Sequence, residues 1–308
     1  MAIPTEWEAS IVRFTHSSST RRSLLALIGG LFAVLMTLVF VAPANAAIIG
    51  TSDDRIHVDT AGPPYNTIVE ITIPGKNVYT GKALGRCTGW LYAPNMVATA
   101  GHCVYDKTAV ANGYFDTRGI RVWPGINGST TNAKSCGVVK SFVPDNWKAG
   151  QSQTVGGSPA FDYGAFKLDC SPALQPVLKY GRQPTVGDIT RICGYPKDKA
   201  TDTQWCSDGH VQAVDYYLVY YDNDTCVRES GAPVMAWTGE WNVTAIHGYG
   251  RDPYNTDYNR STYNFGVPIA GTVSANLSTW QNDTSAGTPS NGPAQPDSIG
   301  VSTSCEST

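Results

Sequence analysis

The chain has 308 residues, of which 42% are hydrophobic and 15% are charged, and its formal net charge is −3. A chain of this length and composition can bury one or two hydrophobic cores, which excludes a coiled coil and a disordered polymer. The charged fraction lies below the usual quarter and the sequence has no block of Lys or Arg, so we expect no nucleic-acid partner.

The first 46 residues are typical of an export signal. An arginine pair at 21–22 precedes an apolar run over 24–42, which is followed by Pro43 and the small residues 44–46. We predict cleavage after residue 46 and a secreted, extracellular protein without stable membrane association. The alternative is a permanent anchor, because about 19 apolar residues can span a bilayer. The arginine pair also resembles a twin-arginine export motif, so the export route stays open.

Short runs of β-forming residues recur along the rest of the chain, separated by clusters of Gly, Pro, Asn and Asp. This pattern predicts an all-β sandwich or barrel. The predicted strands span residues 67–73, 89–92, 138–143, 164–168, 189–193, 211–219, 233–236 and 243–248.

One helix is predicted near the C-terminus, where Val273, Leu277 and Trp280 recur at helical spacing. Thr272 can cap its first turn. Residues 283–308 are rich in Ser, Thr, Gly and Pro, so we expect a flexible tail there.

Three separated segments carry residue types used in nucleophilic catalysis. The sequence TAGHC places His102 directly after an apolar strand, and DYGAFKL includes an acid just before one, Asp162. The sequence ESGAP places Ser230 at a turn shaped by Gly and Pro. The chain order of the three residues is therefore His, Asp, Ser.

These segments, in this order, resemble those of the trypsin/chymotrypsin-like serine peptidases. The resemblance covers about residues 47–281. It implies an all-β fold of two packed antiparallel Greek-key β-barrels with a short C-terminal helix. We accordingly expect a peptidase domain over residues 47–282 that divides near 175–185. The implied activity is that of a serine endopeptidase, a hydrolase, acting as a monomer on protein or peptide substrates.

Acyl transfer assigns a role to each residue of the predicted triad. A serine hydroxyl is a poor nucleophile at neutral pH, so His102 must take the proton of Ser230 and return it to the leaving amine. Asp162 would hold the second ring nitrogen and stabilise the imidazolium. The competing acids and the competing nucleophile are Asp145, Asp169 and Ser158. Ser158 is the weaker nucleophile candidate because it precedes the acid and lacks a following glycine.

Position 228 departs from the family pattern. Family members usually have glycine two residues before the nucleophile, since its N–H and that of the serine form the oxyanion hole. Here these donors belong to Arg228 and Ser230. A side chain at 228 favours a peptide that is flipped away at rest, whereas an inward N–H would give an ordinary hydrolase. Glu229 is charged where related enzymes have Asn or Gln, and its partner is either Arg228 or the amino terminus.

Further motifs resemble the bacterial glutamyl endopeptidases. They are IIGTSDDRIHV at 48–58, Asp224 with Thr225, His247 with a glycine three residues on, and NFGV at 264–267. In that branch a hydroxyl, an imidazole and the N-terminal ammonium receive a substrate carboxylate. The resemblance therefore implies cleavage after Glu or Asp, with Thr225 and His247 in the specificity pocket. Asp224 also resembles the acid that selects Lys or Arg in trypsin, so basic specificity stays open, as do small or apolar residues.

All eight cysteines follow the signal, and an even number in an exported chain favours disulfides over free thiols or metal ligands. The remaining histidines stand apart from one another, so we expect neither a metal nor a cofactor. Proximity and the family resemblance suggest three bridges, and elimination leaves a fourth: Cys87–Cys103, Cys136–Cys170, Cys193–Cys206 and Cys226–Cys305.

Two other functions stay open. Because of Arg228, one alternative is a catalytically weak or inactive homologue that binds a protein partner through the same cleft. The Ser/Thr/Pro-rich tail alone favours a cell-surface adhesin that uses the barrels as a scaffold.

Overall fold

The computed structural model describes residues 47–287, apart from 82, 129–133, 151–157 and 173–176, together with residue 305. All of these residues belong to the compact unit formed by residues 42–308. The predicted signal and most of the predicted tail lie outside the described residues. Within them, every helix is too short or too polar to cross a membrane.

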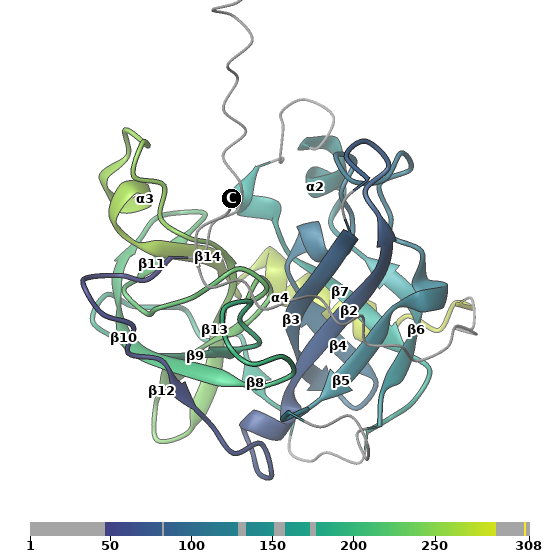
Figure 1. Cartoon of the computed structure of the whole chain (residues 1–308), viewed down its shortest axis with the longest axis horizontal. Helices are drawn as coiled ribbons and strands as arrows, with labels where there is room; N and C mark the ends of the chain where they lie inside the picture. The colour runs from purple at the N-terminus through teal and green to yellow at the C-terminus, as the bar shows by residue number, and fades with distance from the viewer. Residues whose placement is uncertain are drawn as a thin grey trace, which may run out of the picture. The chain divides into compact units, whose positions relative to one another are not determined.

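Six strands of the N-terminal half form a closed antiparallel barrel in the order β2–β3–β4–β7–β6–β5 (Figure 1). Along β2, alternate residues Val69, Ile71 and Ile73 belong to the hydrophobic cluster inside this barrel. The strands are β2 (Ile68–Lys76), β3 (Ala83–Ala93), β4 (Met96–Thr99), β5 (Arg121–Pro124), β6 (Cys136–Phe142) and β7 (Gly164–Leu168).

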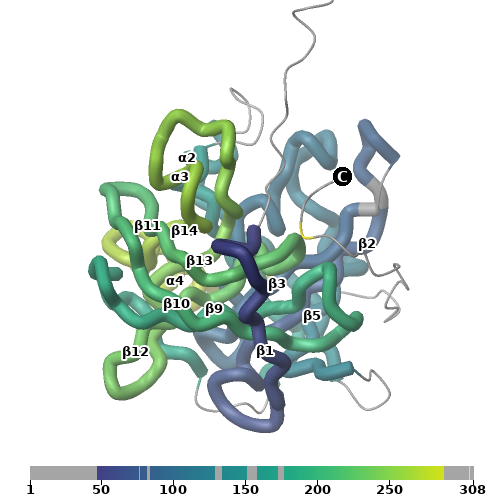
Figure 2. Tube along the Cα trace, turned by 60° about the vertical axis from the view of Figure 1, so that its left-hand side comes forward, coloured from purple at the N-terminus to yellow at the C-terminus, as the bar shows by residue number. Residues whose placement is uncertain are grey.

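Six strands of the C-terminal half close a second antiparallel barrel, because β9 pairs with both β10 and β12 (Figures 1 and 2). The strands are β9 (Ile189–Gly194), β10 (Trp205–Val214), β11 (Val219–Tyr221), β12 (Pro233–Trp237), β13 (Trp241–Tyr249) and β14 (Asn264–Pro268). Two short strands extend this sheet: β1 (Ile56–His57) pairs with β10, and β8 (Lys179–Tyr180) pairs with β13. The predicted all-β fold of two antiparallel barrels is confirmed.

One predicted strand is wrong. Residues 211–219 form a hairpin, in which β10 ends at Val214 and β11 begins at Val219. The carboxylate of Asp215 accepts hydrogen bonds from the N–H groups of Tyr217 and Leu218, both at 2.7 Å. An aspartate that satisfies the backbone two and three residues on stabilises a turn and interrupts the strand.

The helices are α2 (Asp145–Gly150), α3 (Tyr258–Thr262) and α4 (Thr272–Gln281), with 3-10 turns η1 (Tyr65–Thr67), η2 (Gly101–Cys103), η3 (Thr117–Gly119) and η4 (Pro159–Phe161). The predicted C-terminal helix is confirmed as α4, but its cap is wrong. Gly271 is the N-cap residue and Thr272 is already helical. Leu277 is buried in the cluster that joins the two barrels.

Residues of both barrels meet in this joint cluster, which includes Ile68 and Trp90 from the first barrel and Tyr195 and Ile246 from the second. The chain passes from β7, which ends at Leu168, to β9, which begins at Ile189. The segments predicted to carry the chemistry lie at the ends of strands from both barrels.

Three of the four predicted disulfides are present in the structure. They are Cys87–Cys103, Cys136–Cys170 and Cys193–Cys206. Cys226 and Cys305 are free thiols, so the predicted fourth bridge is not formed in this structure. Their sulfur atoms nevertheless lie within 4.8 Å of one another.

Candidate active site

His102 and Asp162 are brought together by the pairing of two neighbouring strands. His102 lies in η2, just after β4, and Asp162 follows η4, just before β7. Thr99 at the end of β4 pairs with Gly164 at the start of β7, so the two flanking turns meet. The fully buried Asp162 carboxylate accepts hydrogen bonds from the backbone N–H of His102 and contacts its Nδ1, both at 2.7 Å.

Asp162 changes the pKa of His102. Burial disfavours the imidazolium of His102, but the charge of Asp162 and its hydrogen bond outweigh burial, and the pKa of His102 is raised. A carboxylate in this position fixes the ring and stabilises the positive charge that appears when the ring takes a proton.

Ser230 is held against the first barrel next to the histidine turn. Its carbonyl oxygen accepts a hydrogen bond from the N–H of Thr88 at 2.9 Å and lies 3.7 Å from Sγ of Cys103. Gly231 has φ 90°, and a Cβ there would lie 2.1 Å from the Thr99 hydroxyl, so the following residue must be glycine. The structure thus brings Ser230 beside the residues that flank His102, although it forms no hydrogen bond to the imidazole.

The competing candidates are placed elsewhere. Asp145 pairs with Lys148 at 2.6 Å on the exposed side of α2. Asp169 accepts a hydrogen bond from the N–H of Gly137 at 2.8 Å. Ser158 precedes η4, and its side chain caps nothing there. Among the three candidate acids, only Asp162 has a described hydrogen bond to His102.

The peptide between Val227 and Arg228 has its carbonyl hydrogen-bonded and its N–H without an acceptor among the described residues. The carbonyl of Val227 accepts a hydrogen bond from the N–H of Lys197 at 2.9 Å. Because a trans peptide directs its C=O and N–H in opposite directions, the N–H of Arg228 faces away from Lys197. Arg228 has φ 85°, and neither its amide nor that of Ser230 donates to another described residue. This arrangement favours an inward N–H over the expected flipped peptide, and both amides lack an acceptor among the described residues.

The carboxylate of Asp224 contacts the segment that precedes β1. Its two carboxylate oxygens accept hydrogen bonds from the N–H groups of Ile49 at 2.6 Å and Asp54 at 3.0 Å. Burial raises the pKa of Asp224, and these two hydrogen bonds oppose the shift. The carbonyl of Ala47 accepts hydrogen bonds from the N–H of Thr225 and the side-chain amide of Asn264, at 3.2 and 2.7 Å.

Thr225 and His247 each present a buried polar atom without a partner among the described residues. These atoms are Oγ1 of Thr225 and Nε2 of His247. The other ring nitrogen of His247, Nδ1, lies 2.7 Å from the hydroxyl of Tyr221. Burial, with the nearby His102, lowers the pKa of His247 to about 3, so this imidazole is neutral at neutral pH.

Sequence reasoning gave no role to several residues of the site. Tyr221 orients His247 through strand register alone, which no local motif signals. Asn264 holds the carbonyl of Ala47, and its only signal was the NFGV motif. Arg55 forms an ion pair with Glu229 at 3.7 Å, a partner that the sequence did not suggest.

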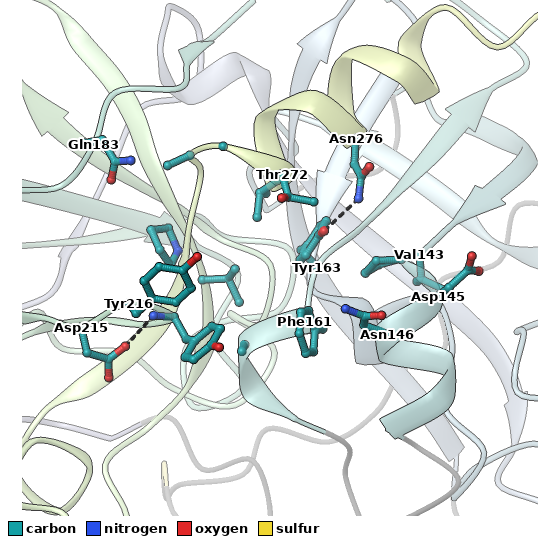
Figure 3. A pocket seen from close by; sticks show the side chains of 18 of the residues that line it. Val143, Asp145, Asn146, Phe161, Tyr163, Gln183, Asp215, Tyr216, Thr272 and Asn276 are labelled. Atoms are coloured by element: carbon teal, nitrogen blue, oxygen red, sulfur yellow. Dashed lines mark hydrogen bonds between the residues drawn. The ribbon is translucent and has the colours of Figure 1, made fainter.

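A separate hollow of about 640 Å³ lies between α2, the β10–β11 turn and the start of α4 (Figure 3). At its edge the amide of Asn276 donates a hydrogen bond to the hydroxyl of Tyr163 at 2.9 Å. None of the predicted catalytic or specificity residues lines this hollow, so we give it no part in the reaction.

Two antiparallel barrels with a histidine, an aspartate and a serine at their junction define the class of two-barrel serine peptidases. The family described as Trypsin matches residues 75–270, and the chain belongs to this family. It is a trypsin-like serine endopeptidase. It is 33% identical over 252 residues to a glutamyl endopeptidase of Bacillus licheniformis, covering 78% of this chain and 71% of that protein. It is 32% identical to a Bacillus subtilis protein named extracellular metalloprotease, covering 77% and 70%.

Solved structures agree with this assignment. A structure of a Glu endopeptidase in complex with MPD matches with a TM-score of 0.60 and 29% identity, covering 76% of this chain and 98% of that one. The protease Anisep from Arthrobacter nicotinovorans matches with a TM-score of 0.55 at 14% identity, covering 73% and 98%. At that identity, the second match supports the fold alone.

Proposed function

We propose that the chain is a secreted endopeptidase that cleaves after glutamate through an acyl-enzyme. The observation that carries the specificity is the pair of buried, unpartnered polar atoms on Thr225 and His247. Buried polar atoms without partners are costly, and a bound ligand removes the cost. The likeness to two glutamyl endopeptidases supports the same choice.

The specificity pocket suits a carboxylate. The hydroxyl of Tyr221 lies 2.7 Å from Nδ1 of His247. We assign the hydroxyl as the donor in this contact, which puts the ring proton of the neutral imidazole on Nε2. Nε2–H and the Thr225 hydroxyl are then two donors for the substrate carboxylate. In a chain that begins at Ala47, the N-terminal ammonium adds a positive charge near Thr225, because the carbonyl of Ala47 accepts a hydrogen bond from the N–H of that residue. A chain that begins at Ile48 would place its ammonium at the nitrogen that follows this carbonyl.

Basic specificity has less support. A carboxylate that selects Lys or Arg must be free to accept from the substrate cation. Asp224 instead uses both oxygens on the N–H groups of Ile49 and Asp54. A substrate lysine would have to displace these contacts, so we place Asp224 in the wall that holds the mature N-terminal segment.

The proposed reaction uses the predicted triad and the two oxyanion amides. The hydroxyl oxygen of Ser230 attacks the scissile carbonyl while His102 takes its proton, and Asp162 stabilises the imidazolium. The N–H groups of Arg228 and Ser230 bind the oxyanion. His102 then protonates the leaving amine, and the acyl-enzyme forms. Water, deprotonated by His102, attacks this ester and releases the acid and Ser230.

The name of the second relative, extracellular metalloprotease, suggests a protein that depends on a metal ion. The groups of possible metal ligands among the described residues of this chain do not favour such a site. Two of the three His, Cys and carboxylate groupings use sulfur atoms of disulfides. The third comprises Asp198, Cys226 and Cys305, and Arg55 donates hydrogen bonds to both Asp198 and Cys305. A buried cation at that position opposes binding of a metal ion.

Matched peptides that differ only in Glu, Gln or Lys before the scissile bond test this proposal. We expect kcat/KM to be at least about tenfold higher for Glu than for Gln, since hydrogen bonds to a charged group contribute more. Thr225→Val should lower kcat/KM for the Glu substrate roughly 10- to 100-fold and change kcat/KM for the Gln substrate little. Thr279→Val, on the exposed side of α4, is the control. Preference for Lys, or equal rates for all three peptides, would refute glutamyl specificity.

A further inference from the structure

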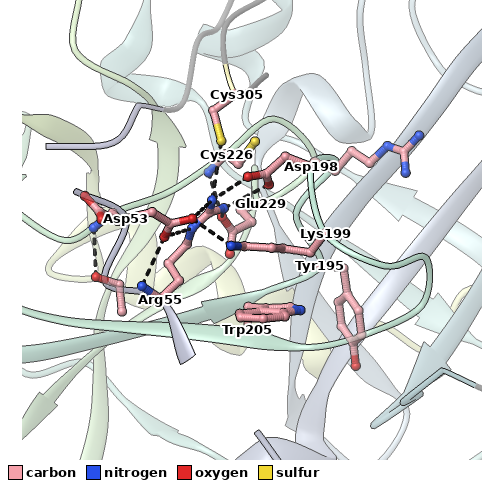
Figure 4. Close-up of polar contacts among 12 residues, drawn as sticks. Asp53, Arg55, Tyr195, Asp198, Lys199, Trp205, Cys226, Glu229 and Cys305 are labelled. Atoms are coloured by element: carbon pink, nitrogen blue, oxygen red, sulfur yellow. Dashed lines mark hydrogen bonds and ion pairs between the residues drawn. The ribbon is translucent and has the colours of Figure 1, made fainter. Parts of the chain in front are cut away.

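Arg55 is a buried arginine carried by the N-terminal segment, and it lies next to the loop that carries the nucleophile (Figure 4). Its side chain is 0% exposed. The guanidinium donates to Asp53 at 2.8 Å and, as a two-pronged fork, to Asp198 at 2.5 and 3.1 Å. Its Nη1 also lies 3.7 Å from Oε2 of Glu229. Burying a cation costs free energy of folding unless carboxylates compensate its charge. The carboxylates of this cluster therefore stabilise the buried guanidinium.

Glu229 directly precedes the nucleophile and holds its turn together. Its side chain is 1% exposed, and Oε2 accepts a hydrogen bond from the N–H of Cys226 at 2.6 Å. Its backbone N–H donates to the carbonyl of Cys226 at 3.0 Å. A Cβ on Gly194 would lie 2.9 Å from Cγ of Glu229, so β9 closes tightly on this side chain. The position of the carboxylate therefore fixes the backbone of residues 226–230.

Arg55 forms an ion pair with the Glu229 carboxyl group at 3.7 Å. Burial raises the pKa of Glu229 to about 8, Arg55 and the N–H of Cys226 oppose this shift, and Asp198 and Asp53 reinforce it. The nearest other cation of the cluster, Lys199, contacts Asp53 at 2.7 Å. Without Arg55, Lys199 would be the one cation of the cluster beside its three carboxyl groups, those of Asp53, Asp198 and Glu229.

Two contacts of the N-terminal segment position Arg55 beside Glu229. Ile56 and His57 pair with β10, and the N–H of Asp54 bonds the Asp224 carboxylate at 3.0 Å. Arg55 lies between these two anchors. The segment that borders the specificity pocket therefore also supplies the cation beside the nucleophile turn.

We propose that Arg55 is a positioning residue for the reaction: through Glu229 it holds the turn from Cys226 to Ser230 with both oxyanion donors aimed at the substrate. It touches neither substrate nor reacting atoms. Its effect reaches the transition state because the N–H groups of Arg228 and Ser230 belong to this turn. Displacing an oxyanion donor lowers turnover by a factor of about 100 or more, whereas ground-state binding depends mainly on the pocket.

The test is a double-mutant cycle of Arg55→Met and Glu229→Gln, assayed with the best-cleaved peptide whatever its specificity. Arg55→Met alone leaves Glu229 without its cation, and we expect kcat to fall about 10- to 100-fold with KM changed less than about threefold. In the Glu229→Gln background the amide can still accept from Cys226 without needing a cation. There Arg55→Met should lower kcat by less than about threefold.

Arg191→Met is the matched control. Arg191 also forms an ion pair with a carboxylate, Asp208, in the second barrel at 2.6 Å, but it does not contact the nucleophile turn. We expect its kcat to equal that of the wild type. If Arg55→Met does not yield folded protein, Arg55→Gln in both backgrounds gives the same comparison, because glutamine keeps hydrogen-bond donors but has no positive charge.

Two results would overturn the proposal. An equal loss of kcat from Arg55→Met in both backgrounds would show that Arg55 acts through Asp53 and Asp198 as ordinary stabilisation. Wild-type kcat in Arg55→Met or Arg55→Gln would show that the turn holds its shape unaided. Both results are independent of glutamyl specificity, because the comparison uses one substrate throughout.

Discussion

Arg228 adopts φ 85°, in the left-handed region where a side chain is unfavourable. The fold maintains this conformation through both neighbouring carbonyls: that of Val227 bonds the N–H of Lys197, and that of Arg228 accepts from the Thr88 hydroxyl at 3.0 Å. These contacts explain how a residue other than glycine can still present its N–H to an oxyanion.

Replacing Arg228 by glycine should therefore relieve strain without changing the oxyanion hole. We expect Arg228→Gly to raise stability by about 1 kcal/mol, the cost of a left-handed residue with a side chain. Turnover should change by less than about threefold. Thermal unfolding and steady-state kinetics measure the two effects. A large loss of activity would show instead that the guanidinium itself contacts the substrate.

The raised pKa of His102 sets the acid limit of activity. Catalysis needs the neutral imidazole, so kcat/KM should fall as pH decreases through a midpoint above the ordinary value of 6.5. The same shift means that protonated His102 favours the folded state, a contribution lost as pH rises through the raised pKa. The pH dependence of kcat/KM gives the midpoint, and a value below 6.5 would contradict the pairing with Asp162.

The candidate triad could be recognised in the sequence because each member carries its signal in its immediate neighbours. Gly101 beside His102 and Gly231 beside Ser230 permit close approaches that a Cβ would block, so these short motifs reflect local geometry. The contacts Arg55–Glu229 and Tyr221–His247 have no such signal. They depend on how distant strands come into register, which neither periodicity nor spacing reveals.

At the scale of elements, strand β1 and the residues before it connect the pocket to the nucleophile turn. Strands of the barrels were predicted where β-forming residues run together, as in β7 and β9. The hairpin at 211–219 was missed because the Asp215 turn interrupts an otherwise continuous run of β-forming residues. The four-residue β5 gave no signal, since its pairing with β2 and β6 depends on barrel closure.

The position of the N-terminal segment makes its first residue important. We expect export to generate a mature chain that starts at Ala47 or Ile48, which intact-mass analysis of secreted protein can determine. Removal of residues 47–49 should raise KM for the Glu substrate, because it deletes the N–H that Asp224 binds and the charge beside Thr225. A natural start beyond Ile49 would contradict the proposed pocket.

Disulfide bonds within each barrel stabilise the whole molecule. We predict a fourth disulfide bond, between Cys226 and Cys305. Oxidation of Cys226 and Cys305 would form one S–S bond and pass two electrons and two protons to an oxidant, such as the disulfide of a thiol oxidase. The sulfur atoms, within 4.8 Å, need to approach to about 2 Å. The result would join the tail to the nucleophile turn.

We therefore expect exported protein to contain four bridges and no free thiol. Cys305→Ser should lower the melting temperature by several degrees, since a bridge that closes a long loop contributes a few kcal/mol. Mass analysis of the unreduced protein and thiol titration measure the outcome. Two titratable thiols in protein recovered from an oxidising compartment would refute the fourth bridge.

The central claim is that Ser230 is the nucleophile, that His102 activates it and that the amides of Arg228 and Ser230 bind the oxyanion. A fluorophosphonate probe tests this claim most directly. We expect the mature protein to take up one probe per chain, on the peptide that contains Ser230. Ser230→Ala should take up none, and His102→Ala should react orders of magnitude more slowly. Labelling that persists in Ser230→Ala, together with retained peptide hydrolysis, would contradict the assignment.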